Sequence, residues 1–523
     1  MIENKTWELV RRPKDANILK NRWVFTKKFR PNGEFIKYKA RGVIKGFLQE
    51  HGVDYDQTYS PTVPWDLLRM FFAICAALGL EIHSMDAVTA FLNGILKHTV
   101  YMEQFEGFED PDHPQHEWVC LLKKALYGLR QAPLLWFETC ANFLISQGFT
   151  PLALCPCWFL LYHKDTNMFI MILLYVDDFL IATKNAERMA WAKALLSKRF
   201  KMTDMGPVHS HLGMQILTTP TSISLTNPIF ITDMLAKHGF TNVNPISTPL
   251  PPGYYPEDDP EVPRHPNVKQ YQEAVGELMW LMVTYRYDIA TAVGFVARFS
   301  HNPSVKHWDL VLRIMKYLKG TVDFKITYRR TAEFAPVGYT DSDWAGDTVD
   351  RKSTSGMVVT MGGAVVAYGS TKQSITAHTS TEAELIAAVL AAKQIIFMRN
   401  IYAHILQVTL PPTPLHIDNQ SAIDIATSYV VNKRSKHIDL RYHIIKEYIR
   451  DGVITLVDTK SADNLADLFT KSVPTPTFTG LLHKLLDNTT KTPPRTSTRN
   501  QPSASLTIAI HTLSPLLTRS LPS

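Results

Sequence analysis

The sequence has little of what marks secreted and membrane-bound proteins. Its 5 cysteines among 523 residues are an odd number without zinc-site spacing, and Cys155 and Cys157 stand too close together for a usual metal knuckle. This scarcity excludes a disulfide-rich scaffold and favours a reducing intracellular setting. The long apolar run at residues 168–183 is interrupted by two aspartates. It therefore falls short of the about 20 apolar residues that a membrane span needs.

Sorting signals and repeats are also missing. The first residues, MIENKTWELVRRPK, contain no signal-peptide core, and we find no lipidation motif and no internal repeat. A hydrophobic content of 45% and a charged content of 20% are typical of a soluble globular protein. The length predicts about two to four domains. The formal net charge of +7 suits a polyanionic partner.

The chain is organised around the stretch MFIMILLYVDDFLIAT, residues 168–183. Apolar residues on both sides of Asp177 and Asp178 predict two buried strands joined by a tight turn. Two adjacent carboxylates in apolar surroundings repel each other and lose hydration, and a divalent cation is the simplest compensation. A metal at this turn is one interpretation. A solvated turn is the other, because aspartate is a common turn residue.

A basic hairpin is predicted upstream of this stretch. NRWVFTKKF (21–29) and EFIKYKARGV (34–43) flank the turn signal Pro31-Asn32-Gly33. The positive side chains fit two roles, protection of an exposed sheet edge and a grip on phosphates. They are Lys27, Lys28, Lys37, Lys39 and Arg41.

A third acid, Asp86, ends the mixed segment EIHSMD, which follows an apolar helix predicted at 66–80. A further helix is predicted to run through residues 88–92. Asp86 is therefore either the cap of that helix or a third carboxylate facing Asp177.

Composition shifts divide the rest of the chain. Residues 121–147 predict a strand, a loop and an amphipathic helix, and residues 184–199 predict a basic helix. Residues 247–267 are rich in proline and acids and predict a linker, followed by helices at 270–319. From residue 334 strands and helices alternate, with acids at several of their ends. Beyond residue 476 the chain is rich in Ser, Thr and Pro, and disorder is expected there.

The motifs between residues 6 and 471 resemble the reverse transcriptase and RNase H region of copia-type LTR retrotransposon polyproteins. In the first half they are YKARGVIKGF, MDAVTAFLNG, LKKALYGLRQAP and LLYVDDFLIA; in the second, YTDSDWAGD, STEAELIA, DNQSA, KHIDLRYH and ADLFTK. The resemblance implies an α+β fold class, with a right-hand polymerase followed by an RNase H-like α/β domain. The implied parts are fingers and palm at 1–246, linker, thumb and connection at 247–333, the RNase H-like domain at 334–475, and a disordered tail at 476–523.

In the first half the resemblance implies a polymerase site with two magnesium ions, or manganese in their place. Asp86 and Asp177 resemble the metal ligands, with Asp178 beside them, and carboxylate oxygens are hard ligands that suit magnesium. Val176 fills the variable position of this kind of aspartate hairpin.

The resemblance also implies four nucleotide-binding residues. Arg41 and Lys28 resemble contacts to the incoming triphosphate, where charge-assisted hydrogen bonds are strongest. Phe91 resembles the aromatic gate that excludes a ribose 2′-hydroxyl, and Gln131 resembles a nucleotide-pocket glutamine. The alternatives are a core aromatic for Phe91 and a helix-entry residue for Gln131.

In the second half the resemblance implies four acids in the RNase H order, which would hold two magnesium ions and direct water at an RNA phosphodiester. Asp343 rivals Asp341, because it lies two residues on and on the same strand face. Thr381 and Glu384 also fit a capping box, and Glu382 is a neighbouring acid. The four implied acids are Asp341, Glu384, Asp418 and Asp467.

The predicted function is RNA-directed DNA synthesis with cleavage of RNA in RNA:DNA hybrids. The expected partners are an RNA template, a DNA primer, the hybrid and deoxynucleoside triphosphates, without a membrane. The expected location is the cytoplasm, in virus-like particles, and also the nucleus, without secretion. Two alternatives stay open, a catalytically inactive nucleic-acid-binding relic and an enzyme with RNase H activity only. Ile95, Cys155, Asn227 and Tyr287 depart from the family pattern, but none is a proposed metal ligand.

Overall fold

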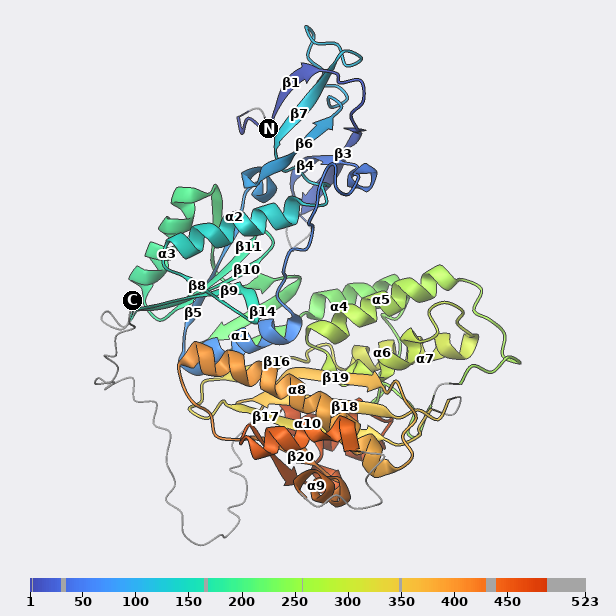
Figure 1. Cartoon of the computed structure of the whole chain (residues 1–523). Coiled ribbons are helices and arrows are strands. Elements are labelled where there is room, and N and C mark those ends of the chain that lie inside the picture. The colour runs from blue at the N-terminus through green and yellow to red at the C-terminus, as the bar shows by residue number, and fades with distance from the viewer. Residues whose placement is uncertain are drawn as a thin grey trace. The chain divides into compact units, whose positions relative to one another are not determined.

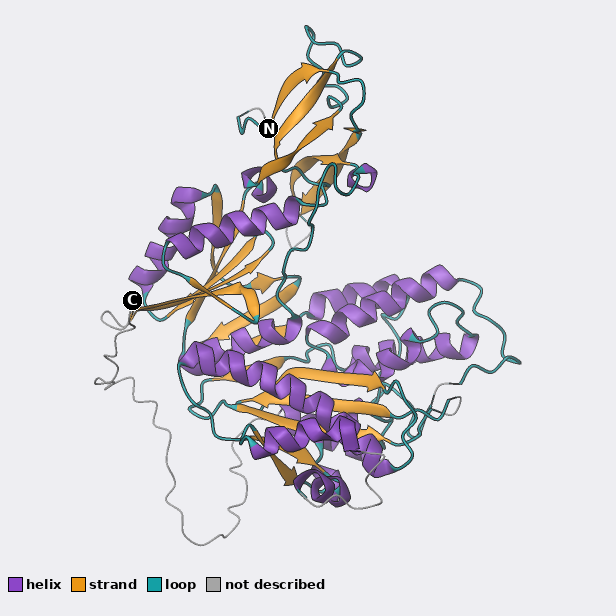
Figure 2. Ribbon diagram, viewed as in Figure 1, coloured by secondary structure: helices purple, strands orange, loops and turns teal. Residues whose placement is uncertain are grey.

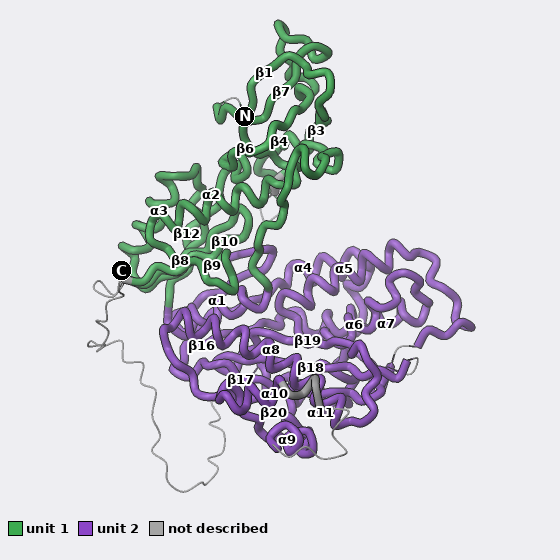
Figure 3. Tube along the Cα trace, viewed as in Figure 1, with its two compact units in different colours: residues 1–64, 80–208 green, residues 65–79, 209–523 purple. Residues whose placement is uncertain are grey.

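The computed structural model describes residues 1, 3–29, 34–163, 168–255, 257–347, 350–428 and 439–486. The chain forms two compact units (Figure 3). The first comprises Met1–Pro64 and Leu80–Val208, and the second comprises Trp65–Gly79 and the chain from His209 onwards. The palm boundary expected at residue 246 therefore does not coincide with the division between the units.

Two small sheets form the N-terminal part of the first unit (Figure 1). One has the strand order β1-β7-β6-β2, and the other is the antiparallel hairpin β3–β4 that the sequence predicts. A 3₁₀ helix, η1 (Gly46–Leu48), follows β4. The strands are β1 (Trp7–Arg11), β2 (Ile18–Leu19), β3 (Asn21–Phe29), β4 (Phe35–Ile44), β6 (Ile95–Met102) and β7 (Trp118–Lys124).

A six-stranded sheet, in the order β12-β5-β11-β10-β9-β8, forms the rest of the first unit. β10 (Met168–Tyr175) and β11 (Asp178–Thr183) are the two apolar strands predicted around the aspartate pair, and they pair antiparallel. β11 pairs on its other side with β5. The remaining strands are β5 (Glu81–Ala87), β8 (Thr150–Leu152), β9 (Cys155–His163) and β12 (Met202–Pro207).

Two helices, α2 (Ala132–Ser146) and α3 (Ala186–Arg199), cover one face of this sheet (Figure 2). Trp136 and Leu144 of α2 and Leu196 of α3 join one buried cluster with alternate strand residues, because every second side chain of a strand points to the same face. This core holds the strands that end at the aspartate turn. The strand residues in the cluster include Ile170, Ile172, Leu174, Phe179 and Ile181.

The segment after Asp86 differs from the prediction. The structure has a 3₁₀ helix, η2 (Ala90–Asn93), instead of a helix through residues 88–92. β5 continues to Ala87, where it still pairs with Met202 of β12, and Thr89 then takes a left-handed conformation with φ +56°. The strand pairing and this reversal delay the helical turn.

The predicted apolar helix at 66–80 is α1 (Trp65–Leu78), and it belongs to the second unit. It packs against β16 and β19. Its buried Arg69 donates hydrogen bonds to the carbonyls of Val366 at 2.7 Å, Val283 at 2.7 Å and Thr284 at 2.9 Å. These bonds, together with the apolar face of α1, explain why the helix leaves the first unit.

A four-stranded sheet, β13-β14-β15-β16, and a group of helices follow in the second unit. β14 and β15 pair antiparallel as a hairpin. The strands are β13 (Ser210–His211), β14 (Met214–Thr219), β15 (Ser222–Thr226) and β16 (Ile326–Arg329). The helices are α4 (Pro228–Lys237), α5 (Val268–Thr284), η3 (Tyr287–Ile289), α6 (Ala290–Ala297) and α7 (Val305–Gly320).

The C-terminal sheet is mixed, in the order β19-β18-β17-β20-β21. Its first three strands are antiparallel, and β17, β20 and β21 are parallel. They are β17 (Pro336–Asp343), β18 (Thr354–Met361), β19 (Ala364–Lys372), β20 (Thr413–Ile417) and β21 (Ile454–Asp458). The accompanying helices are α8 (Ser380–Leu406), α9 (Gln420–Thr427), α10 (Asp439–Arg450), η4 (Ser461–Asp463) and η5 (Leu465–Phe469).

Helix α8 lies against β17, β18 and β20. By length and composition it is apolar enough to cross a membrane, but half of its most apolar stretch is buried inside the structure. A core helix of a globular unit has the same composition. Its contacts with the sheet account for its apolar character.

The first part of the tail expected to be disordered from residue 476 is helical. Residues 475–486 form helix α11 (Thr475–Leu486), with Phe478, Leu481, Leu482 and Leu485 buried. These four residues recur at helical spacing, and this apolar stripe outweighs the nearby Thr and Pro. The prediction is wrong for residues 476–486, and residues 487–523 lie outside the described residues.

Candidate active sites

The aspartate turn lies at the end of the β10–β11 hairpin. Tyr175 pairs with Asp178, so Val176 and Asp177 are the two turn residues. Val176 has φ +56°, a strained conformation for a β-branched side chain, at a turn position that hairpins usually give to glycine. The indole N–H of Trp136 donates to the Val176 carbonyl at 2.5 Å. The tight turn is thus as predicted, and α2 anchors it.

Three aspartates lie near this turn. Asp178 lies directly opposite Asp86 across the β11–β5 pair. The backbone N–H of Ala87 donates to the Asp177 carbonyl at 2.8 Å. Burial, and then the charges of Asp177 and Asp86, raise the pKa of Asp178 to about 6. A bound cation would offset this repulsion.

Asp86 does not cap a helix. It lies inside β5, and the residue that flanks the start of η2 is Thr89, which makes no side-chain cap hydrogen bond. The capping interpretation of Asp86 is therefore wrong. Its position opposite Asp178 supports the interpretation as a third carboxylate.

Arg41 and Phe91 both lie beside Tyr127, which is near these acids. The Arg41 guanidinium carbon is 5.7 Å from the ring centre of Tyr127, and the Phe91 ring centre is 4.6 Å from it. Burial raises the pKa of Tyr127, and the charges of Asp177 and Asp86 add to the increase. The sequence by itself does not identify Tyr127 as a site residue. The feature that could have pointed to it is its position within the motif LKKALYGLRQAP.

Two nucleotide-site predictions have mixed outcomes. Phe91 is half-buried and packs against both apolar clusters of the first unit, so it also serves as a core aromatic. The backbone of Lys28 pairs with Lys37 in the β3–β4 hairpin. The side chain of Lys28 lies outside the described residues.

Gln131 is buried at the start of α2, with its amide engaged by the protein. It accepts a hydrogen bond from the Gln49 side chain at 2.9 Å and donates to the Asp54 carbonyl at 3.0 Å. It directly precedes Ala132, the first residue of the helix. These bonds support the helix-entry role, while the nucleotide-pocket role of Gln131 stays a prediction.

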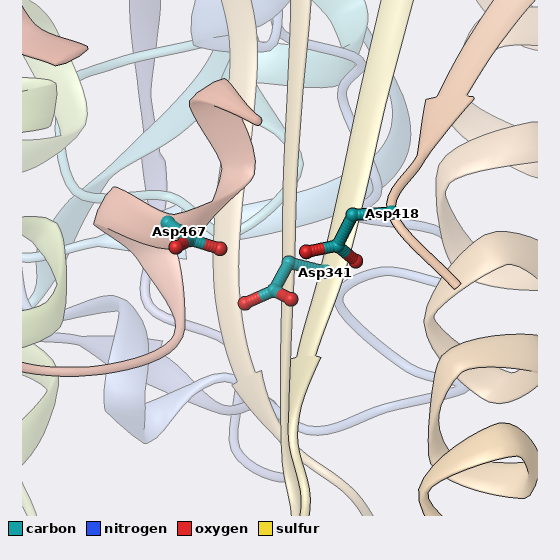
Figure 4. Close-up of side chains that lie close together, drawn as sticks. All are labelled: Asp341, Asp418 and Asp467. Atoms are coloured by element: carbon teal, nitrogen blue, oxygen red, sulfur yellow. The ribbon is translucent and has the colours of Figure 1, made fainter. Parts of the chain in front are cut away.

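In the second unit the structure brings three of the four predicted acids together. Asp341 lies in β17, Asp418 directly follows β20, and Asp467 lies in η5. One carboxylate oxygen from each lies within 4.8 Å of the others. Figure 4 shows the three side chains converging from these three elements. Such a group of carboxylates is suited to a divalent cation.

Glu384, the fourth predicted acid, is buried on α8. Its Oε1 accepts a hydrogen bond from the Ser342 backbone N–H at 3.2 Å. Its Oε2 has no hydrogen-bond partner among the described residues. Burial raises the pKa of Glu384 well above its ordinary value, and the charges of Asp341 and Asp418 add to this. An orphaned oxygen beside two further acids fits a cation site.

Glu382, the alternative to Glu384, belongs to the N-terminal cap of α8. Helix α8 begins at Ser380, and its N-cap is Thr379, which accepts from the Glu382 backbone N–H at 3.1 Å. Glu382 in turn accepts from the His378 backbone N–H at 2.8 Å. The capping box predicted between Thr381 and Glu384 is therefore wrong, because the helix starts earlier.

Asp343, the rival of Asp341, interacts with the Tyr255 hydroxyl, and burial raises the pKa of Asp343. It does not belong to the group of three acids within 4.8 Å. The geometry favours Asp341 as the acid that faces Asp418 and Asp467.

Lys471 is a second residue that sequence reasoning does not single out. Its ammonium lies 3.4 Å from an oxygen of Asp341 and 3.2 Å from an oxygen of Asp467. The Thr470 hydroxyl also donates to Asp341. Burial raises the pKa of Asp467 and the charge of Asp341 adds to this, whereas Lys471 opposes the shift. The Lys471 ammonium is therefore a positive charge of the protein itself beside these acids.

The comparisons with known proteins agree with this geometry. A family model described as reverse transcriptase (RNA-dependent DNA polymerase) matches residues 4–252. The retrovirus-related Pol polyprotein from transposon TNT 1-94 of Nicotiana tabacum is 38% identical over 480 residues, which are 90% of this chain and 36% of that protein. A transposon Ty5-1 protein of Saccharomyces cerevisiae is 30% identical over 311 residues, which are 58% of this chain and 98% of that protein.

The chain spans about a third of the length of the Pol polyproteins that it matches. Among solved structures, a foamy viral protease-reverse transcriptase in complex with double-stranded DNA has a TM-score of 0.44 and 12% identity, over 87% of this chain and 67% of that one. The residues that the family model matches include Asp86, Asp177 and Asp178.

Proposed function

Because this chain belongs to the reverse transcriptase family of copia-type retrotransposon Pol polyproteins, we propose that it extends a DNA primer on RNA and DNA templates. The observation that carries the proposal is the pairing of Asp178 with Asp86 beside the Asp177 turn. These three carboxylates would hold two magnesium ions, with manganese as a substitute. The ions would activate the primer 3′-hydroxyl and stabilise the leaving pyrophosphate.

The side chains around the acids support nucleotide binding. Arg41 carries a planar guanidinium that suits bidentate contact with a phosphate, and it lies beside Tyr127, on which the charges of Asp177 and Asp86 act. Phe91 would reject a ribose 2′-hydroxyl by steric exclusion. Trp136 holds the strained turn at Val176 and thereby orients the acids.

We further propose that the second unit cleaves RNA in RNA:DNA hybrids. Asp341, Asp418 and Asp467 approach within 4.8 Å, and Glu384 adds a buried oxygen without a partner in the described part of the chain. These residues would hold magnesium, which supplies a nucleophilic water and stabilises the leaving oxygen. The mixed five-stranded sheet with α8 against it supports the RNase H-like assignment.

The partners that follow from this proposal are an RNA template, a DNA primer, their hybrid and deoxynucleoside triphosphates. The formal net charge of +7 supports a polyanionic partner. The proposed location is the cytoplasm, in virus-like particles, and the nucleus.

Primer extension on poly(rA)/oligo(dT) tests the polymerase proposal. The wild-type chain should add dTTP in the presence of magnesium, and Asp177→Asn should abolish addition while the protein stays folded. Asp112→Asn, in an exposed loop of the same unit, is the matched control and should extend normally. Soluble, folded wild-type protein without magnesium-dependent extension would refute the proposal and favour the relic or the RNase H-only alternative.

Cleavage of a labelled RNA:DNA hybrid tests the second activity. Asp418→Asn should abolish cleavage, whereas Asp451→Asn, at an exposed carboxylate of the same unit, should not. Cleavage that survives Asp418→Asn would refute the site assignment. If the wild-type protein extends primers but does not cleave the hybrid, the proposed RNase H activity is refuted.

A further inference from the structure

Tyr127 lies beside both of the side chains that the proposed polymerase site needs for nucleotide selection. Arg41, the proposed triphosphate contact, lies 5.7 Å from the ring centre of Tyr127. Phe91, the proposed sugar gate, lies 4.6 Å away with its ring inclined at 57°. A residue that touches both connects the phosphate end of the nucleotide site with its sugar end.

The backbone at Tyr127 is hydrogen-bonded to the end of the strand that carries Arg41. The Ile44 N–H, three residues after Arg41, donates to the Tyr127 carbonyl at 2.8 Å. Gly128 has φ +99°, and a Cβ there would lie 2.0 Å from the Ile44 carbonyl oxygen. Only glycine permits this approach. These contacts thus hold the end of β4 against the loop that carries Tyr127.

The Tyr127 hydroxyl lies near the acids of the same site. Beyond burial, the charges of Asp177 and Asp86 raise the pKa of this hydroxyl, while Arg41 hydrogen-bonds to it and opposes the increase. Tyr127 is half-buried. By contrast, the amide of Gln131 is buried and already bonded to Gln49 and Asp54. Tyr127 is thus a polar side chain of the loop 125–131 that lies near the acids without being fully buried.

We propose that Tyr127 is a nucleotide-selecting residue, whose ring supports Phe91 against the deoxyribose and whose hydroxyl donates a hydrogen bond to the incoming deoxynucleoside triphosphate. This inference rests on the proposed polymerase function and assigns one more residue to that site. Tyr127 acts on the nucleotide directly and on sugar selection through Phe91. Its two contributions, the hydroxyl and the ring, can be removed separately.

Tyr127→Phe removes the hydroxyl and keeps the ring. It should weaken dTTP binding by about 3- to 10-fold, the effect of one hydrogen bond, and raise KM for dTTP more than it lowers kcat. Binding of the primer–template should not change. Tyr55→Phe is the matched control, because Tyr55 also lies under an arginine, Arg130, at 5.6 Å in the same unit. It should leave dTTP binding unchanged.

Tyr127→Leu removes the ring that supports Phe91. Incorporation of UTP relative to dTTP should rise by about 10-fold, because a loosened steric gate tolerates the 2′-hydroxyl. Tyr127→Phe should retain the wild-type ratio. If Tyr127→Leu fails to fold, Tyr127→Phe alone decides the inference.

Binding is measured with dTTP and magnesium on poly(rA)/oligo(dT) whose primer ends in a dideoxynucleotide, so that no turnover is needed. Weaker dTTP binding by Tyr127→Phe supports the inference even where the wild-type chain does not extend primers, an outcome that refutes only the proposed turnover. Unchanged dTTP binding by folded Tyr127→Phe overturns the inference while the polymerase proposal stands. A wild-type complex that does not bind dTTP overturns the inference as well.

Discussion

Asp178 and Asp86 are direct cross-strand partners in the β11–β5 pair. Directly opposed residues of an antiparallel pair project from the same face of a sheet. The two acids therefore come from distant parts of the sequence to one side of the aspartate turn. Burial, and then the charges of Asp177 and Asp86, raise the pKa of Asp178 to about 6, so without metal the arrangement disfavours the ionised carboxylate.

Metal-free protein should lose stability as the pH rises from about 4 to 6. The pKa of Asp178 is raised from 3.8 to about 6 on folding, so the folded state holds the proton more tightly than the unfolded state does. Stability is thus highest below the unfolded pKa and falls through this window. At pH 7 in EDTA, Asp178→Asn should be more stable than wild type by about 1 kcal/mol, a value reduced for solvent screening. Urea unfolding at several pH values checks this, and equal pH dependence in both proteins would contradict it.

Trp136→Phe should loosen the aspartate turn. The variant keeps most of the ring packing but loses the 2.5 Å hydrogen bond to the Val176 carbonyl, which should cost about 1 kcal/mol. The extension rate should fall more than this stability loss explains, because the strained Val176 conformation is no longer held. Adding Val176→Gly should restore part of the rate, since glycine adopts φ +56° without strain. Additive rate losses in the double variant would contradict the anchoring role.

Gln131→Ala should act mainly on stability. It leaves the buried Gln49 amide and Asp54 carbonyl without their partner, which should cost about 1–3 kcal/mol. KM for dTTP should change little in the variant that remains folded. A selective increase in KM without loss of stability would instead support the nucleotide-pocket role. Chemical denaturation and steady-state extension measure the two effects.

Lys471→Met should destabilise the metal-free protein. Removing the ammonium leaves Asp341 and Asp467 without the cation at 3.4 Å and 3.2 Å. The expected cost is about 1–2 kcal/mol, because Lys471 is partly exposed and solvent screens the pair. Magnesium should raise the Tm of Lys471→Met more than that of wild type, since it replaces the lost charge. Lys471→Arg is the control. Equal magnesium-induced shifts in all three proteins would contradict the prediction.

Substitutions at Glu382 and Glu384 should have different effects, the first on stability and the second on hybrid cleavage. Glu382→Ala removes the bond to the His378 N–H and should cost about 0.5–1 kcal/mol, with hybrid cleavage retained. Glu384→Gln should abolish cleavage without lowering stability, because burial and the neighbouring acids raise the pKa of Glu384 and glutamine is the neutral isostere of its protonated side chain. Thermal unfolding and hybrid cleavage on both variants give the comparison. Loss of cleavage in Glu382→Ala at full stability would reverse the assignment.

Local patterns predict much of this fold. The apolar runs around Asp177, the basic hairpin, α1 and α2 are found close to their predicted places, since each depends on periodicity and on nearby turn residues. The predictions are wrong where contact with another element determines the local structure. The helix after Asp86 starts late because β5 stays paired with β12, and α11 forms because its apolar stripe finds a core.

By itself the sequence determined the acids, their order and the strands that carry them, because residue type and spacing are local properties. Tertiary structure alone decided which acids meet. The register of β11 on β5 sets Asp178 against Asp86, and the start of α8 at Ser380 assigns Glu382 to the cap and Glu384 to the acids. It also decided that Tyr127, held by the end of β4, lies beside the site. These choices depend on contacts between segments far apart in the chain, which no local pattern encodes.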